Sequence, residues 1–122
     1  PALADRFPDE LLAGETVSGD WGELRWEPAI AGPGLRPGVH FQCMLSRELD
    51  RVTPLNRREK PLKHWCRELR IPPWWRPYLP VLTSENQPVW LLRAGPMGPE
   101  TTAALNGSKG GLRPVWSLFN AV

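Results

Sequence analysis

Short hydrophobic runs separated by turn residues dominate this chain, and they predict several strands with one main helix. Fifteen prolines and eleven glycines among 122 residues divide the sequence into short elements. Alternating or continuous apolar positions predict strands over 21–27, 39–45, 78–83, 88–93 and 113–119. The four residues from Ser84 to Gln87 predict a hairpin turn between the third and fourth of these strands.

The clearest helical pattern lies between residues 60 and 70. Its apolar positions, spaced i, i+3, i+4 and i+7, are Leu62, Trp65, Cys66 and Leu69. Its basic positions repeat at the same spacing on another face and are Lys60, Lys63, Arg67 and Arg70. Pro61 suits the first helical turn, and the helix must end before Pro72 because proline disfavours helical backbone in the residue preceding it. Burial of the apolar face would therefore turn the basic face toward solvent.

These elements predict an α+β fold, a small and mostly antiparallel β-sheet or sandwich of about six short strands with one main helix packed on it. Residues 29–38 and 95–111 are predicted to be loops. We interpret residues 1–18 as a linker or the end of a preceding helical domain, and residues 19–122 as one domain. The chain starts at Pro1 rather than Met, so we expect it to be part of a longer protein.

The net charge of +2 is unevenly distributed. Residues 1–27 carry seven acids and two bases, whereas residues 51–76 carry eight bases and two acids. A local basic patch on a nearly neutral protein suits an anionic partner, although a solvated cationic face produces the same pattern. No apolar run reaches the roughly 20 residues of a membrane span, and no signal-peptide pattern opens the chain.

Residue types used in catalysis or metal binding do not cluster in the sequence. It has no glycine-rich phosphate loop, no nucleophile elbow and no zinc-protease helix motif. Glu48 and Asp50 are neighbouring acids, a pattern that more often favours solubility than acid–base catalysis. The possible metal ligands His40, Cys43, His64 and Cys66 do not have the paired spacing of structural zinc sites. We therefore predict no catalytic residue, no metal site and no disulfide framework, which is typical of a reduced, cytoplasmic protein.

The remaining chemistry is that of nucleic-acid binding. Basic side chains neutralise phosphates, and arginine grips a phosphate with two hydrogen bonds. A tryptophan stacks on unpaired bases when it is exposed. We expect Trp74 to be buried against the sheet, while the sequence is equally consistent with a buried and with a partly exposed Trp75. The candidate RNA-binding residues are Arg57, Arg58, Lys60, Lys63, Arg67, Arg70, Arg76 and Trp75.

The segment 56–82 resembles the C-terminal domain of tRNA(Ile)-lysidine synthetase. The matching positions are Lys60, Leu62, Lys63, Glu68, Ile71, Pro72, Pro73, Trp74, Arg76, Pro80, Val81 and Leu82. Weaker similarity at 19–29 and 112–119 extends the resemblance over roughly 19–122. The sequence departs from the family pattern at Pro61, where a basic residue is more frequent, at Arg70, which is often glycine, and at 57–59, where a glycine-rich turn is usual.

The resemblance implies a role in bacterial tRNA modification. Members of the family use ATP to attach lysine to the wobble cytidine of an isoleucine tRNA, and they are cytoplasmic ligases. Their catalytic N-terminal domain carries an S-G-G-x-D-S loop, which this sequence lacks, so ATP and lysine would be used outside this chain. The family's C-terminal domain binds tRNA at the acceptor stem and partners the catalytic domain. Its fold resembles a domain of the phenylalanyl-tRNA synthetase β subunit. The sequence does not determine whether the protein forms oligomers.

Two other functions are compatible with the sequence. The same helix and the 95–111 loop suit a module that docks on other domains of its own enzyme without contacting RNA. An independent small enzyme would need a nucleophile beside a base, and the sequence shows no such arrangement.

Overall fold

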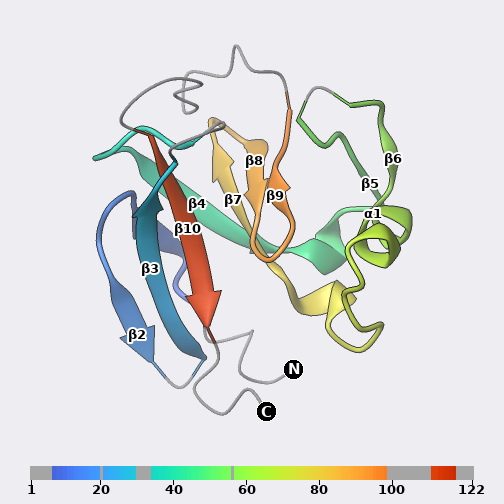
Figure 1. Ribbon diagram of the computed structural model, residues 1–122, viewed down its shortest axis with the longest axis horizontal. Helices are drawn as coiled ribbons and strands as arrows, with labels where there is room; N and C mark the ends of the chain where they lie inside the picture. Colours follow the sequence, from blue (N-terminus) through green and yellow to red (C-terminus); the bar gives the residue numbers. More distant parts are fainter. Residues whose placement is uncertain (1–6, 20, 30–33, 56, 99–110, 118–122) are drawn as a thin grey trace.

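The computed structural model describes residues 7–19, 21–29, 34–55, 57–98 and 111–117. Its largest sheet is antiparallel, with the strand order β1-β4-β7-β8-β9 (Figure 1). The strands are β1 (Glu10–Leu12), β4 (His40–Leu45), β7 (Pro80–Ser84), β8 (Gln87–Leu91) and β9 (Gly95–Pro96). Strands β7 and β8 are joined by Glu85 and Asn86, whose positive φ values of 52° and 65° are those of a type I′ hairpin turn. The predicted hairpin is therefore confirmed.

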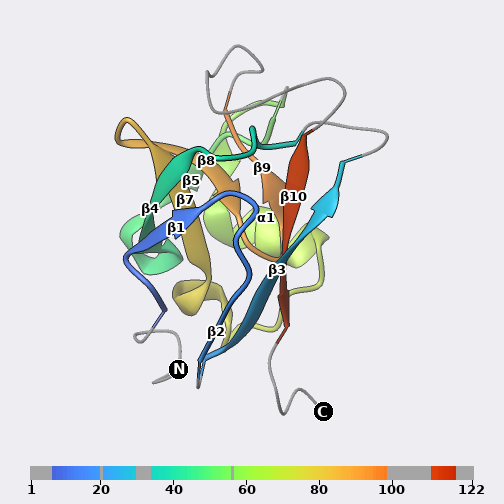
Figure 2. The same cartoon turned by 90° about the vertical axis from the view of Figure 1, so that its left-hand side faces the viewer.

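A second antiparallel sheet, in the order β10-β3-β2, lies beside the first (Figure 2). Its strands are β2 (Val17–Gly19), β3 (Gly22–Pro28) and β10 (Leu112–Ser117). Both sheets contribute to one core, whose fully buried side chains include Leu24, Leu35, Phe41, Val81 and Leu91. The predicted α+β fold with mostly antiparallel strands is confirmed.

The first residues contribute more to this fold than the sequence suggested. Strands β1 and β2 lie inside the segment 1–18 or at its border, which we interpreted as a linker or the end of a helical domain. Phe7, Leu11 and Ala13 are buried in the shared core. The described part of this segment is therefore strand and core, while the position of the domain boundary stays a prediction.

The helix follows a short two-stranded β-pair that is separate from the two larger sheets. The two-stranded pair β5 (Arg51–Val52) and β6 (Lys60–Pro61) leads directly into α1 (Leu62–Glu68), as Figure 1 shows. Leu62, Trp65 and Cys66 are buried in the core, with Cys66 fully enclosed. Three of the four apolar positions predicted for the helix are therefore confirmed.

The fourth, Leu69, is 41% exposed, so the prediction that it is buried was wrong. The reason is the way in which the helix ends. The backbone N–H of Arg70 donates to the Arg67 carbonyl, and that of Ile71 donates to the Cys66 carbonyl. These two bonds, with Arg70 at a φ of 59°, form a Schellman motif. It turns the chain so that Ile71, rather than Leu69, is buried beside Cys66.

A buried hydroxyl then fixes the segment that leaves the helix. The short 3-10 helices η2 (Ser46–Glu48) and η3 (Arg76–Tyr78) are joined through Ser46, which is fully buried. The Ser46 hydroxyl donates to the Arg76 carbonyl and accepts from the Leu79 N–H at 3.0 Å. The Ser46 N–H donates to the Leu79 carbonyl at 2.8 Å. Residues 72–76 are therefore anchored at both ends, by α1 and by η2.

Arg70 occupies a backbone conformation that favours glycine, and this gives a test of the helix end. Replacing Arg70 with Gly should raise the free energy of unfolding by about 1 kcal/mol, because an L-residue in the left-handed region is strained. Arg70→Ala is the matched control, since it removes the same charge but keeps the strain. Thermal or urea unfolding of the two variants measures the difference. Equal stability of Arg70→Gly and Arg70→Ala would contradict the interpretation.

Candidate nucleic-acid interface

The exposed face of α1 carries the basic residues that the sequence predicted there. Lys63 and Arg67 are exposed, beside His64 and Glu68. His64, Arg67 and Glu68 line a shallow surface cavity of about 330 Å³. Three of the four predicted basic positions, Lys63, Arg67 and Arg70, are therefore exposed, whereas Lys60 lies in β6 and is half-buried.

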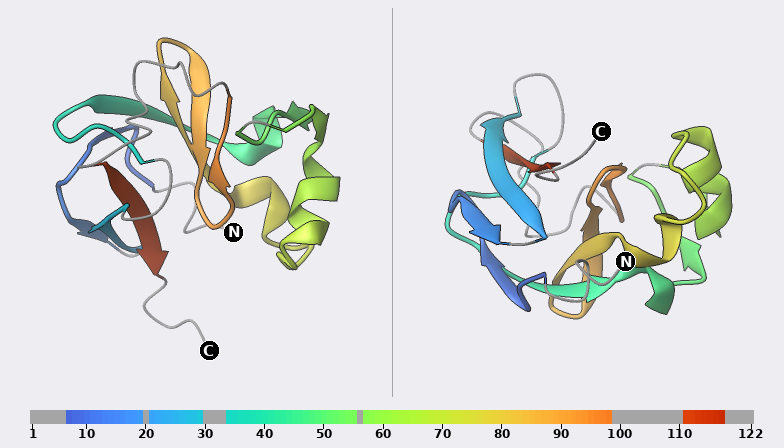
Figure 3. Two further views of the ribbon diagram at one scale, coloured as in Figure 1. Left: turned by 45° about the horizontal axis from the view of Figure 1, so that its top comes forward. Right: turned by 90° about the horizontal axis from the view of Figure 1, so that it is seen from below.

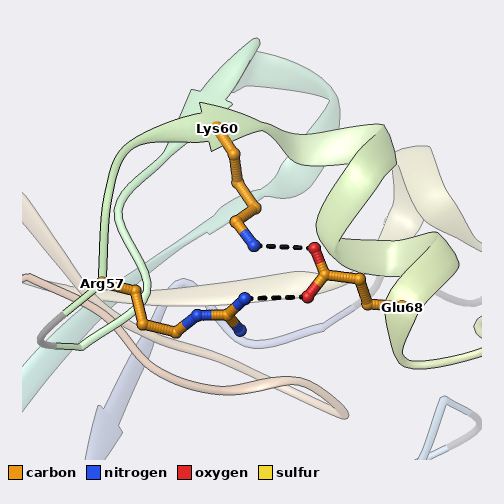
Figure 4. Close-up of polar contacts among 3 residues, drawn as sticks. All are labelled: Arg57, Lys60 and Glu68. Atoms are coloured by element: carbon orange, nitrogen blue, oxygen red, sulfur yellow. Dashed lines mark hydrogen bonds and ion pairs between the residues drawn. The ribbon is translucent and has the colours of Figure 1, made fainter.

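Two further predicted residues meet at Glu68, the one acid on this face of the helix. Figure 4 shows that Lys60 and Arg57 approach the two oxygens of its carboxylate. Lys60 Nζ lies 2.7 Å from Glu68 Oε2, and Arg57 Nη2 lies 3.0 Å from Oε1. The hydrogen bond from Lys60, and to a smaller extent the one from Arg57, lowers the pKa of Glu68. Its carboxylate therefore stays ionised at lower pH than that of an ordinary glutamate.

This cluster changes the electrostatics of the predicted patch. Arg57 and Lys60 share one carboxylate, so together the three side chains carry a single positive charge. The sequence did not indicate this pairing, because Glu68 lies eight positions after Lys60 and eleven positions after Arg57. Their donors are partly committed to Glu68 before any ligand arrives. The other exposed basic residues of the prediction are Arg58, Lys63, Arg67 and Arg70, and none of these four forms an ion pair with a described residue.

Arg76 supports the segment as well as carrying charge. Its side chain is half-buried, and its Nε donates to the Ile71 carbonyl at 2.9 Å. This bond closes the turn that follows α1. The positive charge of Arg76 also acts on the thiol of Cys66, but burial has the larger effect and raises the pKa of that thiol. Arg76 therefore offers fewer free donors to a ligand than an exposed arginine does.

Of the two neighbouring tryptophans, the first has the opposite exposure from the one expected. Trp74 is 68% exposed, so the prediction that it is buried was wrong. Trp75 is half-buried and packs edge-on against Trp116, with ring centroids 5.9 Å apart. A turn closed by the Trp75 N–H on the Pro72 carbonyl presents the two side chains in different directions. Trp74 is thus the aromatic ring available for stacking, and the sequence contained no periodicity that could distinguish the pair.

The other candidate chemistry was metal binding or catalysis. Among the described residues, no group of three or more His, Cys, Asp or Glu side chains could hold a metal ion. Burial, followed by the nearby Asp9 and Glu10, raises the pKa of Cys43 to about 12. Glu48 accepts a hydrogen bond from the Leu45 N–H at 3.2 Å, which stabilises the start of η2. Cys43 therefore has a role in packing, and Glu48 has a role in the local backbone.

In the part of the chain that the structure describes, no helix is long and apolar enough to cross a membrane.

Comparison with known families identifies the segment that contains this interface. The family model described as TilS substrate C-terminal domain matches residues 42–98. The match runs from β4 to β9 and includes α1, Glu68 and Trp74. It is narrower than the resemblance inferred from the sequence, because β2, β3 and β10 lie outside it. No curated protein matches the chain. Residues 42–98 of this chain therefore belong to the TilS substrate C-terminal domain family.

Proposed function

We propose that this chain is the tRNA-holding, non-catalytic C-terminal domain of a tRNA(Ile)-lysidine synthetase. The observation that carries the proposal is the exposed basic face of α1, with Trp74 beside it, inside the segment that matches the family. Four of the exposed bases have no acidic partner among the described residues, and their charge is available to a polyanion.

The finer parts of the proposal come from the family. The ligand would be an isoleucine tRNA, held at its acceptor stem in the bacterial cytoplasm. Another domain of the same enzyme would use ATP to attach lysine to the wobble cytidine. This domain's contribution is then binding energy and orientation, which hold the substrate while the reaction proceeds elsewhere.

The geometry favours recognition of the RNA backbone rather than of base edges. The major groove of an RNA helix is too deep and narrow for side chains to read, so duplex RNA is recognised by shape and phosphates. Lys63 and Arg67 lie one helical turn apart on α1, and Arg70 follows at its end. Trp74 adds a flat apolar surface that suits an unpaired base at the end of a duplex.

The basic face should determine how tRNA binding depends on salt. Replacing Lys63 and Arg67 together with Gln should weaken tRNA binding about tenfold at low salt and lower the slope of log K against log salt concentration by about 2. Filter binding at four or five salt concentrations measures both quantities. Arg36→Gln is the matched control, because Arg36 is an exposed arginine outside α1. If the unmodified chain does not bind tRNA at low salt, or the double variant binds as well as it does, the proposal fails.

The carboxylate of Glu68 should weaken tRNA binding at the same surface. Glu68→Gln removes the charge that engages Arg57 and Lys60, so we expect roughly two- to fivefold tighter tRNA binding at low salt and a steeper salt dependence. Glu23→Gln is the control, since Glu23 pairs with Arg25 on the other sheet and its removal changes the net charge equally. Weaker binding by Glu68→Gln would show instead that the carboxylate organises the two bases for the ligand.

Substitution of Trp74 should distinguish RNA binding from the alternative function, which is docking on another domain of the same enzyme. If Trp74 stacks on a base, Trp74→Ala should remove about 1–3 kcal/mol of binding, which is roughly 5- to 150-fold in affinity, and Trp74→Phe should keep part of it. Thermal stability should hardly change, because Trp74 is exposed.

The docking alternative rests on one observation, the exposure of two large apolar side chains, Leu69 at the end of α1 and Trp74 in the turn that follows. In that case Trp74→Ala would leave tRNA affinity unchanged and would weaken association with the rest of the enzyme. Measuring both affinities for the same variant decides between the two functions.

A further inference from the structure

A second basic site lies away from the helix, between the two sheets. A cavity of about 260 Å³ is lined by the turn after β8, by β9 and by β10. Strands β9 and β10 are the edge strands of different sheets, and β9 lies between β10 and α1 (Figures 1 and 3). The residues that matter for its chemistry are Arg93, Arg113, Trp90 and Trp116. Arg113 and Trp116 lie outside the segment that matches the family.

Arg93 is held in place at the mouth of this cavity. It is exposed and has a φ of 75° in the tight turn that joins β8 to β9. Its guanidinium carbon lies 5.7 Å from the centre of the Trp116 ring, which is a cation–π contact. A cation–π contact uses no hydrogen-bond donor, and the Arg93 guanidinium forms no ion pair with a described residue, so its N–H groups stay available for an anion.

Neither arginine of the cavity is neutralised within the described part of the molecule. Glu27 is the cross-strand neighbour of Arg113, yet the two form no ion pair. Two cations that line one cavity repel each other, and the apolar walls formed by Trp90 and Trp116 strengthen that repulsion. An anion in the cavity would relieve it.

The size of the cavity indicates which kind of anion fits. Pockets for drug-sized ligands begin at about 300 Å³, so this cavity suits a phosphate group better than a whole nucleotide. Arginine side chains that converge on a phosphate hold it with paired hydrogen bonds.

The cavity is also physically connected to the proposed RNA-binding surface. Trp116 contacts Arg93 on the cavity side and Trp75 on the other, with Trp75 directly following the exposed Trp74. The backbone that carries Trp74 is therefore supported by the same Trp116 ring that contacts Arg93.

We propose that Arg93 and Arg113 bind a backbone phosphate of the same RNA that α1 holds. This second contact rests on the proposed function, because it assumes an RNA ligand. The binding surface would then consist of two contact regions, the basic helix α1 and the edge of β10. The RNA would cross the turn that carries Trp74 and Trp75.

The test uses the 122-residue chain and Gln substitutions at both arginines. Arg93→Gln with Arg113→Gln should weaken tRNA binding about tenfold at low salt and lower the salt slope by up to about 2. Combined with Lys63→Gln and Arg67→Gln, the losses should multiply, because the two pairs contact different phosphates. Arg36→Gln serves again as the control for removing an exposed arginine. Arg93→Lys with Arg113→Lys keeps the charge but loses the paired hydrogen bonds of arginine, so it should bind more tightly than the Gln variant and less tightly than the unmodified chain, which separates loss of charge from loss of fold.

The outcomes distinguish this inference from the proposed function. If the helix variant loses affinity and the Arg93 and Arg113 variant does not, the second site is wrong while the proposed function stands. If the unmodified chain does not bind tRNA, the proposed function fails, and titration with inorganic pyrophosphate then tests the cavity alone. Shifts of the Arg93 and Arg113 side-chain NMR signals that saturate, and that the Gln variant lacks, would support a phosphate site for a free ligand. No shift with either ligand would overturn it.

Discussion

Burial of one side of α1 is the constraint on which the interface depends. Trp65 and Cys66 are enclosed in the core, and each large apolar side chain that leaves water contributes about 1.5–3 kcal/mol. An exposed ion pair contributes about 0–1 kcal/mol, so the apolar face, and not the charges, sets the rotation of the helix. Lys63 and Arg67 face solvent as a consequence. The Schellman motif at Arg70 and the hydroxyl of Ser46 then fix where the chain goes next, and with it the position of Trp74.

The sequence predicted the elements whose pattern is strong and local. Strands β3, β4, β7, β8 and β10, the hairpin and the helix all lie within the predicted ranges or within a residue or two of them. The strands β1, β2, β5, β6 and β9 have two or three residues each, which is too short for a periodicity to be visible. Strand β1 also depends on a partner far along the chain, since Leu11 pairs with Phe41. Local pattern carries no information about such pairing.

The candidate site was predictable in composition but not in detail. The spacing of lysines and arginines indicated a basic face, because period 3.6 places such residues together on any helix. It could not indicate that Glu68 would hold Arg57 and Lys60, since those contacts depend on how the β5–β6 pair returns to α1. Leu69 and Trp74 were misassigned for a related reason. A helix end is set by a few backbone hydrogen bonds, and a shift of one residue changes which side chain is buried.

Rigid support beneath the exposed groups would favour the proposed binding of a polyanion. Binding loses affinity when side chains and loops must first be ordered, so groups on fixed backbone are more effective. Here the backbone beneath Trp74 is held by the Ser46 hydrogen bonds and by the packing of Trp75 on Trp116. The same Trp116 ring positions Arg93. One tryptophan, Trp116, thus supports both the backbone that carries Trp74 and an arginine that lines the cavity, so one packed cluster underlies both of the proposed contacts.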